Sequence, residues 1–261
     1  MSSSHRRVSP RIAGCAVLSL FAMGALFGCA AMDGAVSREA KRHVAEAKRL
    51  ETEKKVKEAL AEYNKAIDAS PNYVDAYLGA GACSVRLNQL DNAESAYKRA
   101  INLRNTDPEI YHNLGIVYAQ KGDLAAAAEN LQKAVRYGSK DSNTHVFLGM
   151  VYKDQGKFKN AIREYEKSLK MDANNAFAYN NMGIAYVAMK EYDEAEAAYL
   201  KAEQADADFA DVHFNLGKFY DDVLPNKAKA LMHYQRYLDL TKQQDPAILK
   251  RMAEIIRENV R

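Results

Sequence analysis

The chain contains 261 residues, of which 37 are Lys or Arg and 34 are Asp or Glu. The first 28 residues hold Arg6, Arg7 and Arg11 and no acidic residue, so the remainder has 34 basic and 34 acidic side chains and no net charge. A neutral body disfavours nucleic acid as a partner, because phosphate binding needs a clustered excess of Lys and Arg. With 48% apolar residues, 13 Gly and 5 Pro, the composition favours a folded, all-α protein.

The N-terminus has the three-part pattern of a secretory signal. Residues 1–11 are polar and basic, and an uncharged apolar run from Ile12 ends at Gly28, a small residue in front of Cys29. This pattern predicts a signal peptide over residues 1–28. The ending Leu-Phe-Gly-Cys resembles the lipobox of bacterial lipoproteins. That resemblance implies cleavage after Gly28, a diacylglyceryl group on the Cys29 thiol and acylation of the new amino group.

Two other interpretations of this segment compete with the first. An earlier ending at Cys15 also resembles a lipobox, but almost no apolar run precedes it, so no segment could thread into a membrane. Residues 12–32 are uncharged for 21 positions, which is long enough for an uncleaved spanning helix. The many small residues and the order of the lipobox favour the lipoprotein.

The residues after Cys29 bear on location. They are Ala30 and Ala31, whereas Gram-negative lipoproteins with Asp at the first of these places are usually retained in the inner membrane. By that resemblance the protein is expected in the bacterial cell envelope, lipid-anchored to the outer membrane and facing the periplasm. Residues 29–37 then form a lipidated tether, and its eight residues after Cys29 span at most about 28 Å, which keeps the body close to the bilayer.

A phrase typified by YHNLGIVY, residues 111–118, recurs along the rest of the chain. Its first residues are spaced by 34 positions: Tyr77, Tyr111, His145, Tyr179 and His213. A second set keeps the same register, and its spacings of four and three put its members on one helical face. The set comprises Ala59/Tyr63/Ala66, Ala93/Tyr97/Ala100, Ala127/Leu131/Ala134, Ala161/Tyr165/Ser168 and Ala195/Tyr199/Ala202. A constant period of this size predicts stacked two-helix units rather than one closed core.

These residues resemble the tetratricopeptide repeat, whose pattern is W-x2-L-G-x2-Y in the first helix and A-x3-F…P in the second. In the third unit the matches are Tyr111, Leu114, Gly115, Tyr118, Ala127 and Leu131. The chain departs from the pattern by lacking Trp and by keeping the final Pro only at Pro71. The resemblance implies a right-handed α-solenoid of six repeats over residues 38–240. The repeated Gly and Ala are expected to let paired helices approach, with the tyrosines filling the gaps between them.

The two ends of the array depart from the repeat. The first unit has polar His43 and Glu46 where Tyr and Leu are expected, which suits an end cap. The sixth unit carries one extra residue, expected within residues 223–225. Asp245 followed by Pro predicts a helix start. A single apolar stripe comes next, made of Ile248, Leu249, Met252, Ile255 and Ile256. Residues 241–261 are therefore expected to form a C-terminal capping helix, with membrane contact as the alternative.

The first helices present a second face, opposite the repeated phrase, that is not uniformly polar. It carries asparagines, phenylalanines and aliphatic residues: Asn113, Asn180, Asn181 and Asn215; Phe147, Phe177 and Phe214; Ile116, Met150 and Ile184. An amide both donates and accepts, so a row of asparagines can hold an extended peptide, and exposed phenylalanines would form a binding patch. This face is the expected peptide groove. The alternative is that the asparagines bond neighbouring helices and the aliphatic residues pack between units.

No catalytic site can be assembled from the sequence. Cys83 is the one cysteine outside the N-terminal segment, and it falls at a small-residue position, which favours packing over reactivity. The histidines are dispersed, so no metal ligand spacing is present and no cofactor is expected. Gly149 to Gly156-Lys157 has the wrong spacing for a phosphate loop, and Gly156 is expected in the turn between paired helices.

The sequence therefore favours a non-catalytic interaction protein that holds an envelope protein or peptide segment in its groove and helps to assemble an envelope complex. Within that class it resembles the six-repeat lipoproteins that pilot secretin assembly for type IV pili. The alternatives are an adaptor that presents substrates to a protease or peptidoglycan enzyme, and a cytoplasmic scaffold held by an uncleaved helix. Homo-oligomerisation is left open.

Overall fold

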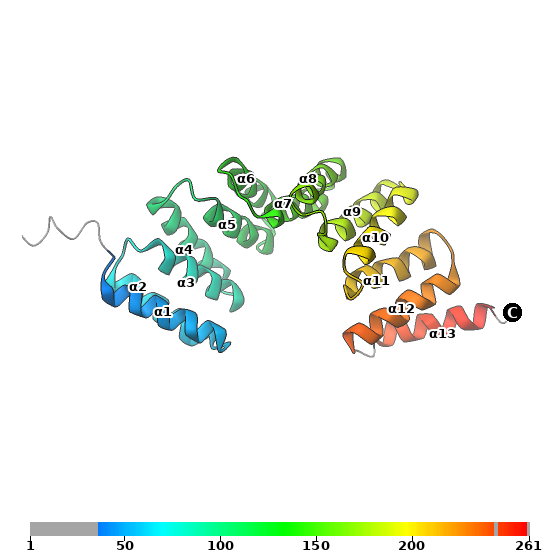
Figure 1. Cartoon of the computed structure of the whole chain (residues 1–261), viewed down its shortest axis with the longest axis horizontal. Helices are drawn as coiled ribbons and strands as arrows, with labels where there is room; N and C mark the ends of the chain where they lie inside the picture. Colours follow the sequence, from blue (N-terminus) through cyan, green and yellow to red (C-terminus); the bar gives the residue numbers. More distant parts are fainter. Residues whose placement is uncertain (1–35, 243–244, 260–261) are drawn as a thin grey trace, which may run out of the picture.

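The computed structural model describes residues 36–242 and 245–259, and over these it contains helices and no strand. Six helix pairs and a final helix follow one another (Figure 1). The first helices are α1 (Arg38–Thr52), α3 (Val74–Arg86), α5 (Pro108–Gln120), α7 (Ser142–Asp154), α9 (Ala176–Met189) and α11 (Ala210–Lys218). The second helices are α2 (Val56–Ala69), α4 (Leu90–Leu103), α6 (Leu124–Arg136), α8 (Phe158–Met171), α10 (Tyr192–Ala205) and α12 (Lys227–Thr241). A short π-helix, η1 (Phe219–Val223), continues α11, and α13 (Pro246–Asn259) comes last.

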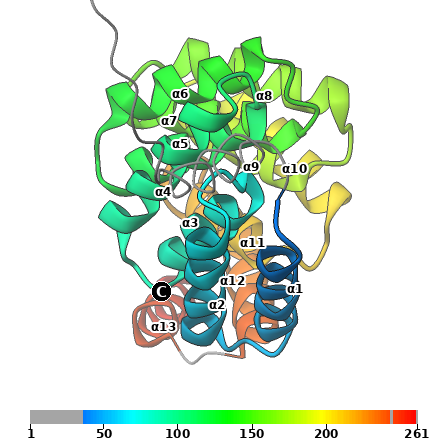
Figure 2. The same cartoon turned by 90° about the vertical axis from the view of Figure 1, so that its left-hand side faces the viewer.

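The pairs stack side by side into an arch, with α1 and α2 at one foot and α12 and α13 at the other (Figures 1 and 2). Each helix contacts its partner and the next helix along the chain, and the first helices of successive pairs also contact one another, from α1 and α3 to α9 and α11. At the top of the arch α5 and α7 lie beneath α6 and α8. The first helices thus form the inner wall, and the expected all-α solenoid is confirmed.

The predicted signal peptide and the lipidation site Cys29 lie outside the described residues. None of the helices in residues 36–242 and 245–259 combines the length and the apolar character needed to cross a bilayer. The anchor therefore stays a prediction from the sequence.

A left-handed residue recurs in the turn within each of the first five pairs. Positive φ angles occur at Lys54, Asn88, Gly122, Gly156 and Lys190, one every 34 residues. A residue in this conformation ends the first helix and lets the chain reverse, and glycine adopts it without a Cβ penalty. The φ of 73° at Gly156 confirms its role as a turn residue.

The seam inside each pair is filled as the repeat pattern predicts. The alanines and tyrosines of the second helices are buried, as are the first-helix glycines that face them. A Cβ added at Gly149 would lie 2.4 Å from Tyr165, and one added at Gly183 would lie 2.5 Å from Tyr199. The tyrosine ring therefore occupies the space that a Cβ on the glycine would fill.

The extra residue of the sixth unit is absorbed in η1. Leu224 N donates to Phe219 O at 2.8 Å, the five-residue step of a π-helix, and the widened turn buries Phe219 and Tyr220. The structure thus places the extra residue within Phe219–Val223, a range that begins before the expected residues 223–225. Beyond it Tyr234 again meets Gly217, the contact that Tyr199 makes with Gly183. The π-helix restores the register of the repeat before α12 begins.

Helix α13 begins as predicted and packs on α12. Asp245 Oδ1 accepts hydrogen bonds from Ala247 N at 2.9 Å and Ile248 N at 3.3 Å, which caps the helix. Ile248 and Ile255 are buried, whereas the other two branched members of the expected stripe, Leu249 and Ile256, are exposed. The stripe is therefore narrower than the sequence suggested, and about half of it faces solvent.

Candidate functional site

A pocket of about 350 Å³ opens on the inner wall near the first foot of the arch. Its lining comes from α1, α3 and α5 together with one side chain of α2: Lys48, Glu51, Tyr63, Asp75, Leu78, Gly79, Ala82, Glu109 and Asn113. Gly79 stands where later units have Asn113, Phe147, Asn181 and Asn215. A Cβ on Gly79 would lie 2.1 Å from Tyr63 Cζ, so the glycine leaves room for the tyrosine ring at the base of the pocket.

The pocket has an excess of negative charge. It contains three carboxylates and one lysine. Within the described chain Asp75 and Glu109 form no ion pair, so their charges are free to meet a cation. The side chain of Asn113, one helical turn after Glu109 on α5, makes no hydrogen bond to any described residue, and its amide is available to a peptide group.

The third carboxylate, Glu51, is already engaged by its own chain. It accepts a hydrogen bond from Tyr63 Oη at 2.7 Å, and its other oxygen lies 3.5 Å from Arg86 Nη1. The Cys83 thiol also points at Glu51, with Sγ 3.7 Å from Oε1. Burial and then the nearby carboxylate raise the pKa of Cys83 to about 12, so the thiol stays protonated. This supports the packing role expected for Cys83.

The remaining asparagines of the expected row are bonded within the protein. The Asn181 amide donates to Phe177 O at 2.9 Å, one turn earlier in its helix. Asn215 Nδ2 donates to Asn180 Oδ1 at 2.9 Å, which ties α11 to α9. Asn180 and Asn215 therefore bond between helices and Asn181 bonds its own helix, whereas the Asn113 side chain alone of the four makes no hydrogen bond to a described residue.

The three phenylalanines are covered to different degrees. Phe147 is half-buried and meets the His112 ring edge-on, with 5.4 Å between centroids. Phe214 is half-buried against Tyr237, at 5.4 Å. Phe177 is 39% exposed and meets the Phe209 ring, with 5.9 Å between centroids. They form separate aromatic contacts along the inner wall, and Phe177 is the member that offers the most surface.

The aliphatic positions are half-buried. Met150 packs against the core of the fourth and fifth units, and Ile184 packs against that of the fifth and sixth. Both follow the alternative of packing between units. Ile116 is also half-buried, and it lies outside those two clusters.

The sequence analysis missed Asp75 and Gly79 as members of the pocket. The available signal was the glycine at the asparagine position of the second unit, which marks a place where the wall is hollowed. The unpaired state of Asp75 could not be read from sequence, because several Lys and Arg side chains of the first repeats could have been its partner.

Comparisons with known proteins agree with this architecture. A family model described as TPR repeat matches residues 85–122, 149–190 and 185–221, and one described as tetratricopeptide repeat matches residues 108–141. The chain folds as a tetratricopeptide-repeat (TPR) solenoid. No curated protein sequence matches it.

Solved TPR structures share the fold at low identity. PilW, described as a widely conserved type IV pilus biogenesis factor, is 16% identical with a TM-score of 0.73, covering 80% of this chain and 96% of PilW. PilF of Pseudomonas aeruginosa is 17% identical with a TM-score of 0.69, covering 83% and 97%. In the Cut9–Hcn1 structure of the APC/C, the match is 22% identical with a TM-score of 0.71 and covers 83% of this chain. The TPR chain described here spans only 43% of that protein.

Proposed function

We propose that this protein is a non-catalytic, membrane-anchored TPR scaffold that holds a segment of an envelope protein against its inner wall and helps to assemble or position an envelope complex. TPR proteins bind protein or peptide partners, and the inner wall formed by the first helices is the surface on which an extended segment can meet several repeats at once. The observation that carries the proposal is the pocket around Gly79, with its unpaired carboxylates and free amide.

The chemistry of this pocket favours a basic guest. Asp75 and Glu109 come from successive first helices, so together they flank a guest that crosses from α3 to α5. A Lys or Arg side chain would pair with them, and Asn113 would bond the guest backbone without reading its sequence. Because the pocket is open to solvent, these charge interactions are expected to weaken as salt is added.

Peptides of matched length and composition, differing only in Lys/Arg or Asp/Glu, test this directly by fluorescence anisotropy. The basic peptides are expected to bind the purified mature chain more tightly. The double change Asp75→Asn and Glu109→Gln is expected to weaken them roughly 10- to 100-fold, because hydrogen bonds to charged groups are lost.

The matched control is Asp68→Asn on the exposed side of α2, which removes one negative charge outside the pocket. It is expected to leave peptide affinity unchanged. Equal affinity for basic and acidic peptides, or equal weakening by Asp68→Asn, would refute the pocket as the binding site.

The anchor is proposed from the lipobox at Cys29. Cells expressing the full chain are expected to incorporate labelled palmitate into it, and globomycin is expected to leave its signal peptide uncleaved. The variant Cys29→Ser should lose the label, because the acyl chains are attached through this residue. Palmitate incorporation by intact Cys29→Ser protein would exclude this anchor and favour an uncleaved spanning helix over residues 12–32.

A narrower role as a pilotin for type IV pilus secretins is supported by the similarity of fold to PilF and PilW. An adaptor for a protease or peptidoglycan enzyme would use the same groove. The partner crosslinked through the pocket in cells separates the two roles, since a secretin subunit favours the first and an enzyme favours the second.

A further inference from the structure

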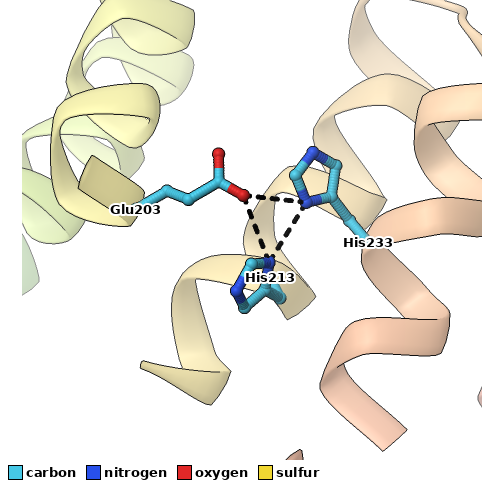
Figure 3. A group of neighbouring side chains, drawn as sticks. All are labelled: Glu203, His213 and His233. Atoms are coloured by element: carbon cyan, nitrogen blue, oxygen red, sulfur yellow. Dashed lines mark hydrogen bonds and ion pairs between the residues drawn. The ribbon is translucent and has the colours of Figure 1, made fainter. Parts of the chain in front are cut away.

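Three ionisable side chains from the fifth and sixth units point at one another (Figure 3). Glu203 comes from α10, His213 from α11 and His233 from α12. The two Nδ1 atoms are 3.2 Å apart, and Glu203 Oε1 lies 3.7 Å from His213 Nδ1 and 3.9 Å from His233 Nδ1. Both imidazoles are 3% exposed, whereas the Glu203 side chain is 32% exposed, so the cluster is buried on one side and reachable from solvent on the other.

Comparison of the repeats shows that two of these residues form a recurring pair. A histidine at the first position of the repeated phrase meets a polar partner on the second helix: His43 Nδ1 lies 2.6 Å from Glu62, and His145 Nδ1 lies 2.8 Å from Glu164. Where that first position is Tyr, the second-helix residue is Ala or Asn. In the sixth unit the partner is a second histidine, His233, so the carboxylate that would accept a proton from His213 is missing from its own unit.

The carboxylate is supplied instead by the preceding unit. The position of Glu203 is aliphatic in the four units before it, as Ile67, Ile101, Val135 and Leu169. Those side chains are half-buried between neighbouring units. An acidic residue at this position gives up apolar contact. Among the first five units only the fifth has one, and the sixth unit, which follows it, carries the two histidines. The substitution is therefore specific to this cluster.

The ring nitrogen of His213 that faces the centre has a lone pair to offer. His213 Nε2 lies 3.0 Å from Ala207 O, a carbonyl that can only accept, so the proton of the neutral ring is on Nε2 and Nδ1 is free. A hydrogen bond from the outer ring nitrogen to a backbone carbonyl is the usual second-shell arrangement of a metal-binding histidine.

We propose that Glu203, His213 and His233 bind one divalent transition-metal ion, with Zn²⁺ as the best match. The three distances between His213 Nδ1, His233 Nδ1 and Glu203 Oε1 define a triangle whose centre lies about 2.1 Å from each of these atoms. Zn–N and Zn–O bonds have the same length, roughly 2.0–2.2 Å. Two imidazoles and one carboxylate are donors that suit Zn²⁺ and its neighbours rather than Mg²⁺ or Ca²⁺. Three protein ligands leave a fourth position for water, on the side where Glu203 is exposed.

Binding at this place would join the last two repeats. The ligands belong to three consecutive helices, so the ion would fix α10 of the fifth unit to the pair α11 and α12. The expected consequence is a stiffer second half of the arch, visible as slower amide hydrogen exchange in these helices when the metal is present.

The test uses the mature chain without a histidine tag and ZnCl₂ as the probe. Isothermal titration calorimetry is expected to show one Zn²⁺ per chain, and Co²⁺ is expected to give the visible absorption of a low-coordinate His₂–carboxylate site. Glu203→Gln and His233→Gln are expected to weaken Zn²⁺ binding by at least roughly 10- to 100-fold, the loss typical of removing even a second-shell group.

His145→Gln is the matched control, because it removes a histidine from the equivalent pair of the fourth unit, where the partner is Glu164 and the preceding unit offers Val135. It is expected to leave Zn²⁺ affinity unchanged. Should His233→Gln lose helicity by circular dichroism, the partly exposed Glu203→Gln decides the question. No binding at tens of micromolar Zn²⁺, or equal binding by wild type and Glu203→Gln, would overturn the proposal.

Discussion

Asp221→Asn is expected to loosen α13 from the last repeat and to lower the free energy of unfolding by about 2–4 kcal/mol. The Asp221 side chain is 2% exposed and accepts from Arg251 Nε at 2.7 Å and Nη2 at 2.8 Å, a bidentate pair that joins η1 to α13. Lys227 Nζ, at 2.7 Å, joins it to α12. Asparagine keeps the shape but loses the charge, so two cations lose their counterion.

The effect of this substitution should depend on pH. The Arg251 guanidinium, assisted by Lys227, lowers the pKa of Asp221 to about 2. A lowered pKa in the folded state means that the stabilisation is complete above the unfolded pKa of about 3.9 and is lost as the pH falls toward 2. The difference between wild type and Asp221→Asn, measured by urea unfolding, is therefore expected to be constant from pH 5 to 7 and to shrink below pH 4.

The adjacent residue provides the control. Asp222 is exposed and forms no ion pair within the described residues, so Asp222→Asn is expected to change the unfolding free energy by less than about 0.5 kcal/mol. Equal losses for the two variants, or a loss for Asp221→Asn that persists undiminished near pH 2, would show that the buried charge pair is not the cause.

Gly183→Leu is expected to lower the free energy of unfolding by about 1–3 kcal/mol through overpacking of the α9–α10 seam. Even a Cβ at this position would lie 2.5 Å from the Tyr199 ring, which is 4% exposed and cannot swing into solvent. The ring also meets Phe219 edge-on at 5.8 Å, so a displaced Tyr199 pushes on the sixth unit. Amide hydrogen exchange should therefore speed up in α9, α10 and η1 together.

Ala188→Leu on the same helix serves as the comparison, because Ala188 is exposed and a leucine there meets no buried ring. It is expected to stay within about 0.5 kcal/mol of wild type. Faster exchange confined to α9, or an unfolding free energy equal to that of Ala188→Leu, would contradict the idea that one seam transmits strain to the next unit.

The periodic features of the fold were predictable, because a residue type that recurs every 34 positions must occupy the same structural position in every repeat. Tyr165 under Gly149 and the turn at Gly156 follow from such recurrence. The residues that break the period were harder to place. The extra residue of the sixth unit was expected within residues 223–225, and the structure puts it in η1, where widening one helical turn keeps Phe219 and Tyr220 buried.

The candidate site was predictable only in outline. The inner wall and Asn113 were expected, but Asn181 bonds its own helix and Asn215 bonds Asn180, choices that depend on which acceptor lies within reach in three dimensions. Spacing rules for metal ligands likewise describe ligands on one helix or loop. Glu203, His213 and His233 come from three helices, and only the packing of two repeats brings them together.

Over residues 36–242 and 245–259, contacts between helices stay within one repeat or between adjacent repeats, so nothing in this part of the chain braces one foot of the arch against the other. A small change of tilt at each junction therefore adds up along the array, and the distance between the two ends can change while every pair keeps its own core. On the proposed function, such a change of span would let the inner wall fit a thicker or thinner guest, with the free-energy cost spread over all the junctions.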